Sequence, residues 1–180
     1  MKKFHRFASL IAVLALALSL GAVSAAAAEP EVLSDDPVVS LMMAADDFEV
    51  RQSDDGAYTI MTASVPTAQL PKTILTRASM TKRGTATPLN DSKFTFQCYD
   101  GAGSHCRLIT TNVDDEWDLE VTYAYNDGEN VSITDSVKAG DSRITVISNN
   151  NGEDLDFDID VTIAADRAPS VDWEFEGEQY

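Results

Sequence analysis

An alternating acidic run contains the residues whose spacing most suggests chemistry. Its carboxylates are Asp154, Asp156, Asp158 and Asp160, and they alternate with Leu155, Phe157, Ile159 and Val161. In a strand, alternate side chains share one face, so the four carboxylates would form a ladder spaced by about 6.6–6.8 Å. Carboxylate oxygens are the ligands that Ca²⁺ prefers, which makes this ladder a candidate cation site with Ca²⁺ as its ion.

A solvated strand face is the alternative interpretation, and we favour it. Carboxylates along a straight strand lie too far apart to surround one ion, and an acidic outer face keeps a sheet soluble. The polar loop before the ladder contains Gly152, but an EF-hand-like loop with that glycine at its sixth position would start at Ile147, which cannot bind an ion through its side chain.

A second candidate site is an interval without acidic residues, between Asp55 and Asp91. The interval is rich in Thr and Ser, and its basic residues are Lys72, Arg77, Lys82 and Arg83. Such a face could bind an anionic polymer of the cell surface or the acidic edge of another copy of the chain. An ordinary pair of exposed strands explains the same residues, and both interpretations stay open.

Cys98 and Cys106 flank a turn-forming segment, Tyr99 to His105. In an oxidising compartment we expect the two to form a disulfide. A structural zinc site needs four ligands, and the sequence offers only one histidine near these two cysteines and no second cysteine pair.

Catalytic signatures are scarce, and we assign no catalytic residue. His105 is the only histidine after the leader described below, and it adjoins Cys106. No serine lies in a nucleophile-elbow motif. Paired carboxylates for glycoside hydrolysis stay an alternative, because any two acids of the chain could converge in the fold.

Residues 1–28 have the pattern of a cleavable signal peptide. Lys2, Lys3 and Arg6 precede an apolar run from Ala8 to Val23, and small residues follow, so cleavage is expected after Ala25 or Ala28. The apolar run is too short for a membrane span, so we expect no transmembrane segment in the mature chain. The expected location is the outside of the cell or its envelope.

The mature chain is strongly acidic. The whole sequence has 13 basic and 30 acidic residues, and the leader takes three of the basic ones, which leaves a formal charge of −20. Such a charge repels nucleic acid and anionic membranes and attracts cations or a basic partner.

Alternating apolar residues and regular turns predict an all-β fold after residue 45. Four hairpins are expected: Phe48 to Gln52 with Tyr58 to Val65, Phe94 to Cys98 with Cys106 to Thr111, Trp117 to Tyr125 with Asn130 to Thr134, and Ser142 to Ser148 with Leu155 to Ile163. The turns predict which residues face each other: Val50 and Met61, Phe96 and Leu108, Tyr123 and Val131, Ile144 and Ile159, and Arg143 and Asp160.

Further strands are expected at Thr73 to Met80 and at Val171 to Phe175, whereas Val38 to Met43 fits a short strand or a helical turn. The prediction is an antiparallel two-sheet β-sandwich of about nine strands at 46–180, preceded by a lead-in at 29–45.

These observations predict a secreted or envelope-associated, non-catalytic module that binds a partner, a surface polymer or a cation. The partner is an unidentified extracellular protein or polymer. The alternatives are a small secreted hydrolase with paired carboxylates and a structural surface protein that self-associates.

Overall fold

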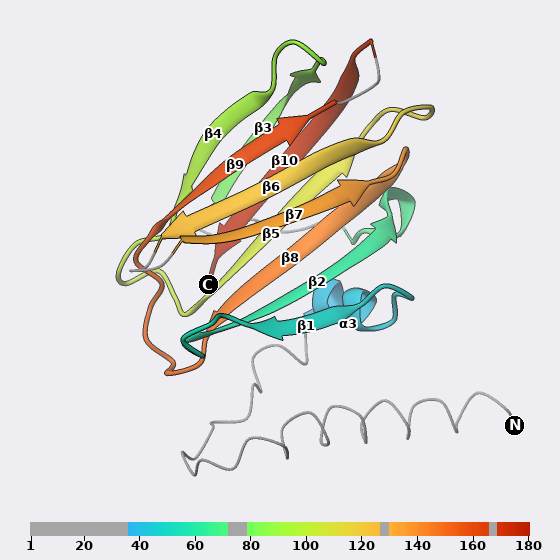
Figure 1. Ribbon diagram of the computed structural model, residues 1–180. Coiled ribbons are helices and arrows are strands. Elements are labelled where there is room, and N and C mark those ends of the chain that lie inside the picture. The colour runs from blue at the N-terminus through green and yellow to red at the C-terminus, as the bar shows by residue number, and fades with distance from the viewer. Residues whose placement is uncertain (1–35, 72–78, 127–129, 166–168) are drawn as a thin grey trace, which may run out of the picture.

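The computed structural model describes residues 36–71, 79–126, 130–165 and 169–180. These residues form one α-helix, α3 (Pro37–Met43), one short 3-10 helix, η1 (Thr67–Gln69), and ten strands (Figure 1). The strands are β1 (Glu49–Gln52), β2 (Tyr58–Pro66), β3 (Ser79–Ala86), β4 (Ser92–Gln97), β5 (His105–Asn112), β6 (Leu119–Asn126), β7 (Asn130–Val137), β8 (Asp141–Asn149), β9 (Asp158–Ala164) and β10 (Val171–Gln179).

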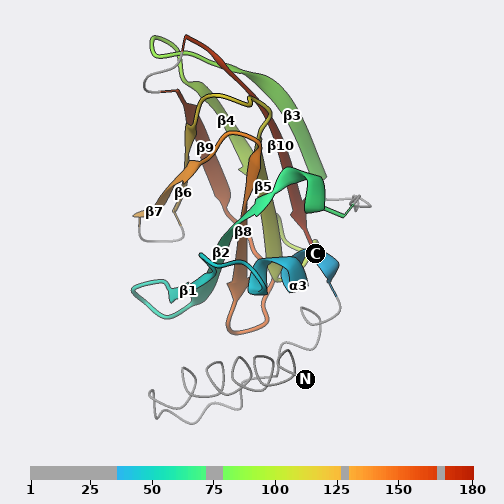
Figure 2. The same ribbon diagram turned by 90° about the vertical axis from the view of Figure 1, so that its right-hand side faces the viewer.

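The strands form two antiparallel sheets that face each other, as Figures 1 and 2 show. The large sheet has the order β1-β2-β8-β5-β10-β3, and the small sheet has the order β4-β9-β6-β7. The described residues are mostly in strands that form two antiparallel sheets, which confirms that part of the prediction, and there are ten strands among them in place of about nine.

Alternation along the strands builds the core between the sheets. In β9, Ile159, Val161 and Ile163 are buried while Asp158 and Asp160 are exposed. The facing strand β10 buries Trp173 and Phe175 in the same apolar cluster. These two strands therefore present apolar side chains to the space between the sheets at every second position, as a period of two requires.

A second apolar cluster lies on the opposite face of the large sheet, under α3. Val38, Val39 and Met42 of the helix pack on side chains of β2, β5 and β8 that point away from the small sheet. The helix begins where the side chain of Asp36 accepts a hydrogen bond from Val38 N at 2.7 Å, with proline in its first turn. These are ordinary signals for a helix start, so the segment is helical where the sequence left strand and helix open.

Two of the predicted hairpins exist. Val50 faces Met61 between β1 and β2, so that register is confirmed. In the β6–β7 hairpin Tyr123 faces Ile133, not Val131, so the predicted register is wrong by two residues. The strands pair as far as Asn126 and Asn130. Because the shift is an even number of residues, the same side chains still face the core.

The other two predicted hairpins are wrong. Phe96 faces Ile159 across β4 and β9, and Leu108 faces Thr145 across β5 and β8. Likewise β8 pairs with β2 and β5, whereas β9 pairs with β4 and β6. In both cases the connecting segment passes from one sheet to the other. Turn-forming residues are compatible with such a connection as well as with a hairpin.

One boundary expectation also changes, and two expectations lie wholly or mostly outside the described residues. β10 is confirmed as a strand and extends beyond Phe175 to Gln179. Most of the strand expected at Thr73 to Met80 and the whole leader fall outside the ranges given above. Within those ranges, no helix is long and apolar enough to cross a membrane.

Replacing Phe157 with alanine should lower the free energy of unfolding by roughly 3–5 kcal/mol. Its ring is buried, stacks on Tyr125 with the centroids 5.0 Å apart, and meets Tyr58 edge-on at 5.5 Å. Asp156→Asn is the control, because Asp156 is exposed one residue away. Urea unfolding of both variants measures the difference, and equal stabilities would contradict this description of the core.

Candidate functional site

A groove of about 620 Å³ opens beside one edge of the large sheet. Its walls come from the end of α3 and the turn after it, from the end of β2, and from β7 with the β7–β8 turn. The charged residues in its lining are Asp46, Asp47, Asp135, Asp141, Lys138 and Arg143, and the apolar ones are Leu41, Ala44, Ala45, Val65 and Pro66.

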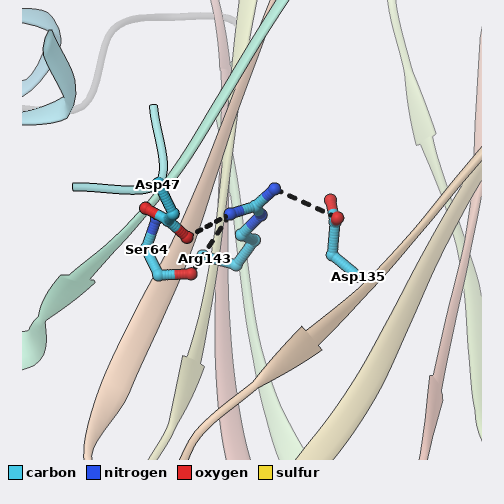
Figure 3. A network of polar contacts seen from close by, with 4 residues as sticks. All are labelled: Asp47, Ser64, Asp135 and Arg143. Atoms are coloured by element: carbon cyan, nitrogen blue, oxygen red, sulfur yellow. Dashed lines mark hydrogen bonds and ion pairs between the residues drawn. The ribbon is translucent and has the colours of Figure 1, made fainter. Parts of the chain in front are cut away.

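Arg143 on β8 is the buried cation of this site, with 6 % of its surface exposed. Its Nη1 donates to Asp47 Oδ2 at 2.9 Å and to Ser64 Oγ at 3.1 Å, and its Nη2 donates to Asp135 Oδ1 at 3.0 Å (Figure 3). A buried guanidinium needs carboxylates and hydrogen bonds to replace its water, and here three side chains bind its two terminal nitrogens.

The sheets explain why these side chains meet. Ser64 faces Arg143 in the β2–β8 ladder, and β7, which contributes Asp135, is the edge strand of the small sheet that lies near β8. Asp47 comes from the turn between α3 and β1. The guanidinium therefore joins the large sheet, the small sheet and the turn after α3.

Asp47 also covers a free stretch of the β2 edge. β1 pairs with β2 only as far as Thr62, and beyond it Asp47 Oδ1 accepts the backbone N–H of Ser64 at 2.8 Å. Two residues on, Pro66 has no N–H to offer. This stretch of edge therefore presents no free donor on that side, which disfavours pairing with another strand.

The pKa of Asp47 is lowered. Partial burial by itself would raise it, but the hydrogen bonds from Ser64 and the positive charge of Arg143 outweigh burial. A carboxyl group that acts as a general acid needs a raised pKa, so Asp47 has the properties of a binding group and not of a proton donor.

The predicted acidic ladder is only partly formed. Asp158 and Asp160 lie on the outer face of β9, where they accept hydrogen bonds from Gln97 Nε2 at 3.2 Å and Thr95 Oγ1 at 2.8 Å. Asp154 and Asp156 precede the strand, and Asp154 accepts the N–H of Gly101 at 2.7 Å.

Nothing in the described ranges supports the calcium hypothesis. No three His, Cys, Asp or Glu side chains of these residues come together in a way that could hold a metal ion. The four carboxylates instead form local hydrogen bonds or face solvent.

The predicted basic patch is not brought together by the residues that can be placed. Lys82 and Arg83 are exposed neighbours on β3 and therefore point to opposite faces. Lys82 Nζ lies 4.8 Å from the centroid of the Phe94 ring, and Arg83 lies 4.0 Å from Glu174. Lys72 and Arg77 lie outside the described residues.

Cys98 and Cys106 are free thiols in the structure, and both are buried. Their side chains are in hydrogen-bonding contact, although β4 and β5 do not form the expected hairpin. Cys106 lies on the large sheet and Cys98 directly follows a strand of the small sheet, so the predicted disulfide would join the two sheets. The disulfide stays a prediction.

His105 lies at the start of β5, where burial lowers the pKa of its imidazole. Its ring packs beside Tyr180, with the ring centroids 5.7 Å apart. It does not line the groove.

The sequence alone did not reveal the groove, because its charged residues come from two distant segments, 46–47 and 135–143, and the second of these passes from one sheet to the other. Arg143 was noticed, but its expected partner Asp160 belongs to the wrong hairpin, and that pairing is incorrect. The sequence did contain one signal. The strand Ser142 to Ser148 has apolar residues on both faces, which favours burial of Arg143, and a buried arginine needs carboxylate partners.

Comparisons with known proteins do not assign the chain to a family. No protein-family model matches it, and no curated protein matches it either.

Solved structures show only distant likeness. A mitogen from Yersinia pseudotuberculosis is 12% identical, with a TM-score of 0.31, over 57% of this chain and 86% of that one. Iron(II) HppE is 12% identical, with a TM-score of 0.30, over 73% of this chain and 56% of that one. TmCBM61, solved with β-1,4-galactotriose, is 11% identical, with a TM-score of 0.28, over 75% of this chain and 90% of that one. Likeness this low carries no argument about function.

Replacing Arg143 with methionine should cost about 3–5 kcal/mol of stability, because Asp135 would keep a largely buried charge without its partner. The double variant Arg143→Met with Asp135→Asn should recover part of the loss, since it removes that charge. Denaturant unfolding of the two variants measures the difference. A loss below about 1 kcal/mol in the single variant would show that the pair is no more than a surface contact.

Asp47 should contribute stability that disappears in acid. Its pKa in the folded chain lies below the ordinary value for an aspartate, so the contribution is present above the unfolded pKa and is lost as the pH falls through the folded pKa. The stability difference between the wild type and Asp47→Asn should therefore shrink as the pH is lowered through this range. A difference that does not change with pH would disprove the assignment.

Proposed function

We propose that this chain is a secreted or envelope-associated, non-catalytic β-sandwich module that binds a basic segment of a partner protein in the groove. The proposal rests on the charge of the groove lining, where four carboxylates meet two cations. The signal-peptide pattern of the leader supports export.

The carboxylates of the groove do not all serve the fold. Asp47 and Asp135 already neutralise Arg143. Asp46 and Asp141 line the same groove and take part in none of the ion pairs found among the described residues, and Lys138 can balance only one of them. The groove therefore keeps a net negative charge that favours a cationic ligand.

The apolar part of the lining narrows the class of ligand. Leu41, Ala44 and Pro66 offer carbon surface next to the carboxylates. Lysine and arginine side chains have the matching form, an apolar stem with a charged end. A bare metal ion would gain nothing from this surface, and nucleic acid would be repelled by the acidic chain.

The covered edge of β2 indicates how such a segment would bind. Because the N–H of Ser64 is taken by Asp47 and Pro66 has none, strand addition on this side lacks donors. Recognition would depend on the side chains of the partner.

The two alternatives keep their own tests. A hydrolase with paired carboxylates would need one carboxyl group with a raised pKa, and Asp47 shows the opposite shift. Self-association would show as a concentration-dependent mass in sedimentation, whereas the binding module proposed here requires none.

Titration calorimetry with a short oligolysine peptide at low salt tests the proposal. The double variant Asp46→Asn with Asp141→Asn should bind roughly 2- to 30-fold more weakly, since exposed ion pairs contribute about 0.2–1 kcal/mol each. Added salt should weaken binding to the wild type.

The matched control is Asp158→Asn with Asp160→Asn, which removes the same charge from the outer face of the small sheet. This control should bind the peptide nearly as the wild type does. Equal weakening in both double variants would mean that the peptide follows net charge alone, and the groove would lose its proposed role.

A further inference from the structure

The two cysteines lie where the chain passes from one sheet to the other. Cys98 follows β4 of the small sheet, and its N–H donates to Phe157 O at 3.0 Å. Cys106 is in β5 of the large sheet, between Ile147 of β8 and Gln179 of β10. The contact between their thiols therefore spans the core.

This contact is closed to solvent. Cys98 is 4% exposed and Cys106 is 0% exposed, and both belong to the main apolar cluster.

The last strand covers the segment that joins the cysteines. Gln179 Nε2 donates to the carbonyl oxygens of Tyr99 at 3.1 Å and Gly103 at 2.9 Å, and Gln179 Oε1 accepts from Tyr99 N at 2.9 Å. A Cβ atom on Gly103 would lie 2.0 Å from the carbonyl carbon of Tyr180, so that glycine allows the end of the chain to pack closely. The end of β10 thus holds the Cys98–Cys106 connection in place.

We propose that Cys98 and Cys106 form an inter-sheet disulfide that closes before β10 docks on β5, and that docked β10 then seals the pair. This inference is independent of the proposed binding function. It replaces the predicted hairpin bridge with a link between the two sheets, and it adds an order of events.

The oxidant is a disulfide-bearing molecule, such as a protein disulfide or oxidised glutathione. One cysteine thiolate attacks a sulfur of the oxidant and forms a mixed disulfide, and one thiol of the oxidant leaves. The second cysteine thiolate attacks the mixed disulfide, forms the Cys98–Cys106 bond and releases the other thiol. The two cysteines lose two protons and two electrons, and the oxidant is reduced to two thiols.

The folded chain disfavours this reaction in two ways, through the access of the oxidant and through the formation of the thiolate. No oxidant can reach the buried sulfurs, and the hydrogen bond with Cys98, together with burial, raises the pKa of Cys106 and suppresses its thiolate. The reaction therefore belongs to the chain whose β10 is still undocked.

Oxidised glutathione tests the proposal on two reduced samples of the full chain, one folded and one refolding from denaturant. The refolding sample should lose both free thiols, measured by alkylation and intact mass. The folded sample should lose them roughly tenfold or more slowly. Equal rates, or two free thiols after oxidative refolding, would overturn the proposal.

Gln179→Ala tests the sealing role of β10. This variant removes the hydrogen bonds to the connection, so its folded form should be oxidised faster than the wild type. Glu174→Gln on the same strand is the control, because its side chain is half exposed and should leave the rate unchanged. An unchanged rate in Gln179→Ala, with the fold verified by circular dichroism, would contradict sealing by β10.

Discussion

The need to neutralise one buried guanidinium shapes the region that we assign to binding. Arg143 lies on the inner face of β8, and its partners come from β2, from β7 and from the turn after α3. If any of the three moved away, a buried charge would lose its compensation, which is costly in an interior of low polarity. The ion pairs and hydrogen bonds of Arg143 therefore also hold the walls of the groove in position.

A second arginine, Arg107, binds the start of segment 36–47, whose end is bound by Arg143. Arg107 on β5 forms ion pairs with Asp36, which caps α3, and with Glu178 of β10. The segment 36–47 is thus fastened at its start by Arg107 and at its end by Arg143, while Val38, Val39 and Met42 fill the apolar face between them. A seven-residue helix has little stability of its own, so these contacts determine its position.

Local patterns in the sequence predicted the local parts of the fold. The first expected hairpin correctly placed Val50 opposite Met61, and the apolar residues Phe157 and Ile159, which alternate with aspartates, are buried. The order of the strands could not be predicted from local patterns, because a turn such as Asn151-Gly152 can follow a strand without leading the chain back into the same sheet. The groove was missed for the same reason. Asp47 is far from Arg143 in sequence, and Asp135, although only eight residues before Arg143, lies in the other sheet, so the three meet only after both sheets form.

We assign partner binding to the acidic groove, and chemical-shift mapping is the most direct test of this assignment. Oligolysine is added to ¹⁵N-labelled protein, and the amide signals that move are assigned. We expect these signals to cluster in the turn after α3, the end of β2 and the β7–β8 turn, with Asp46 and Asp141 among them. Shifts concentrated on the outer face of β9, around Asp158 and Asp160, or spread evenly over the acidic surface would contradict it.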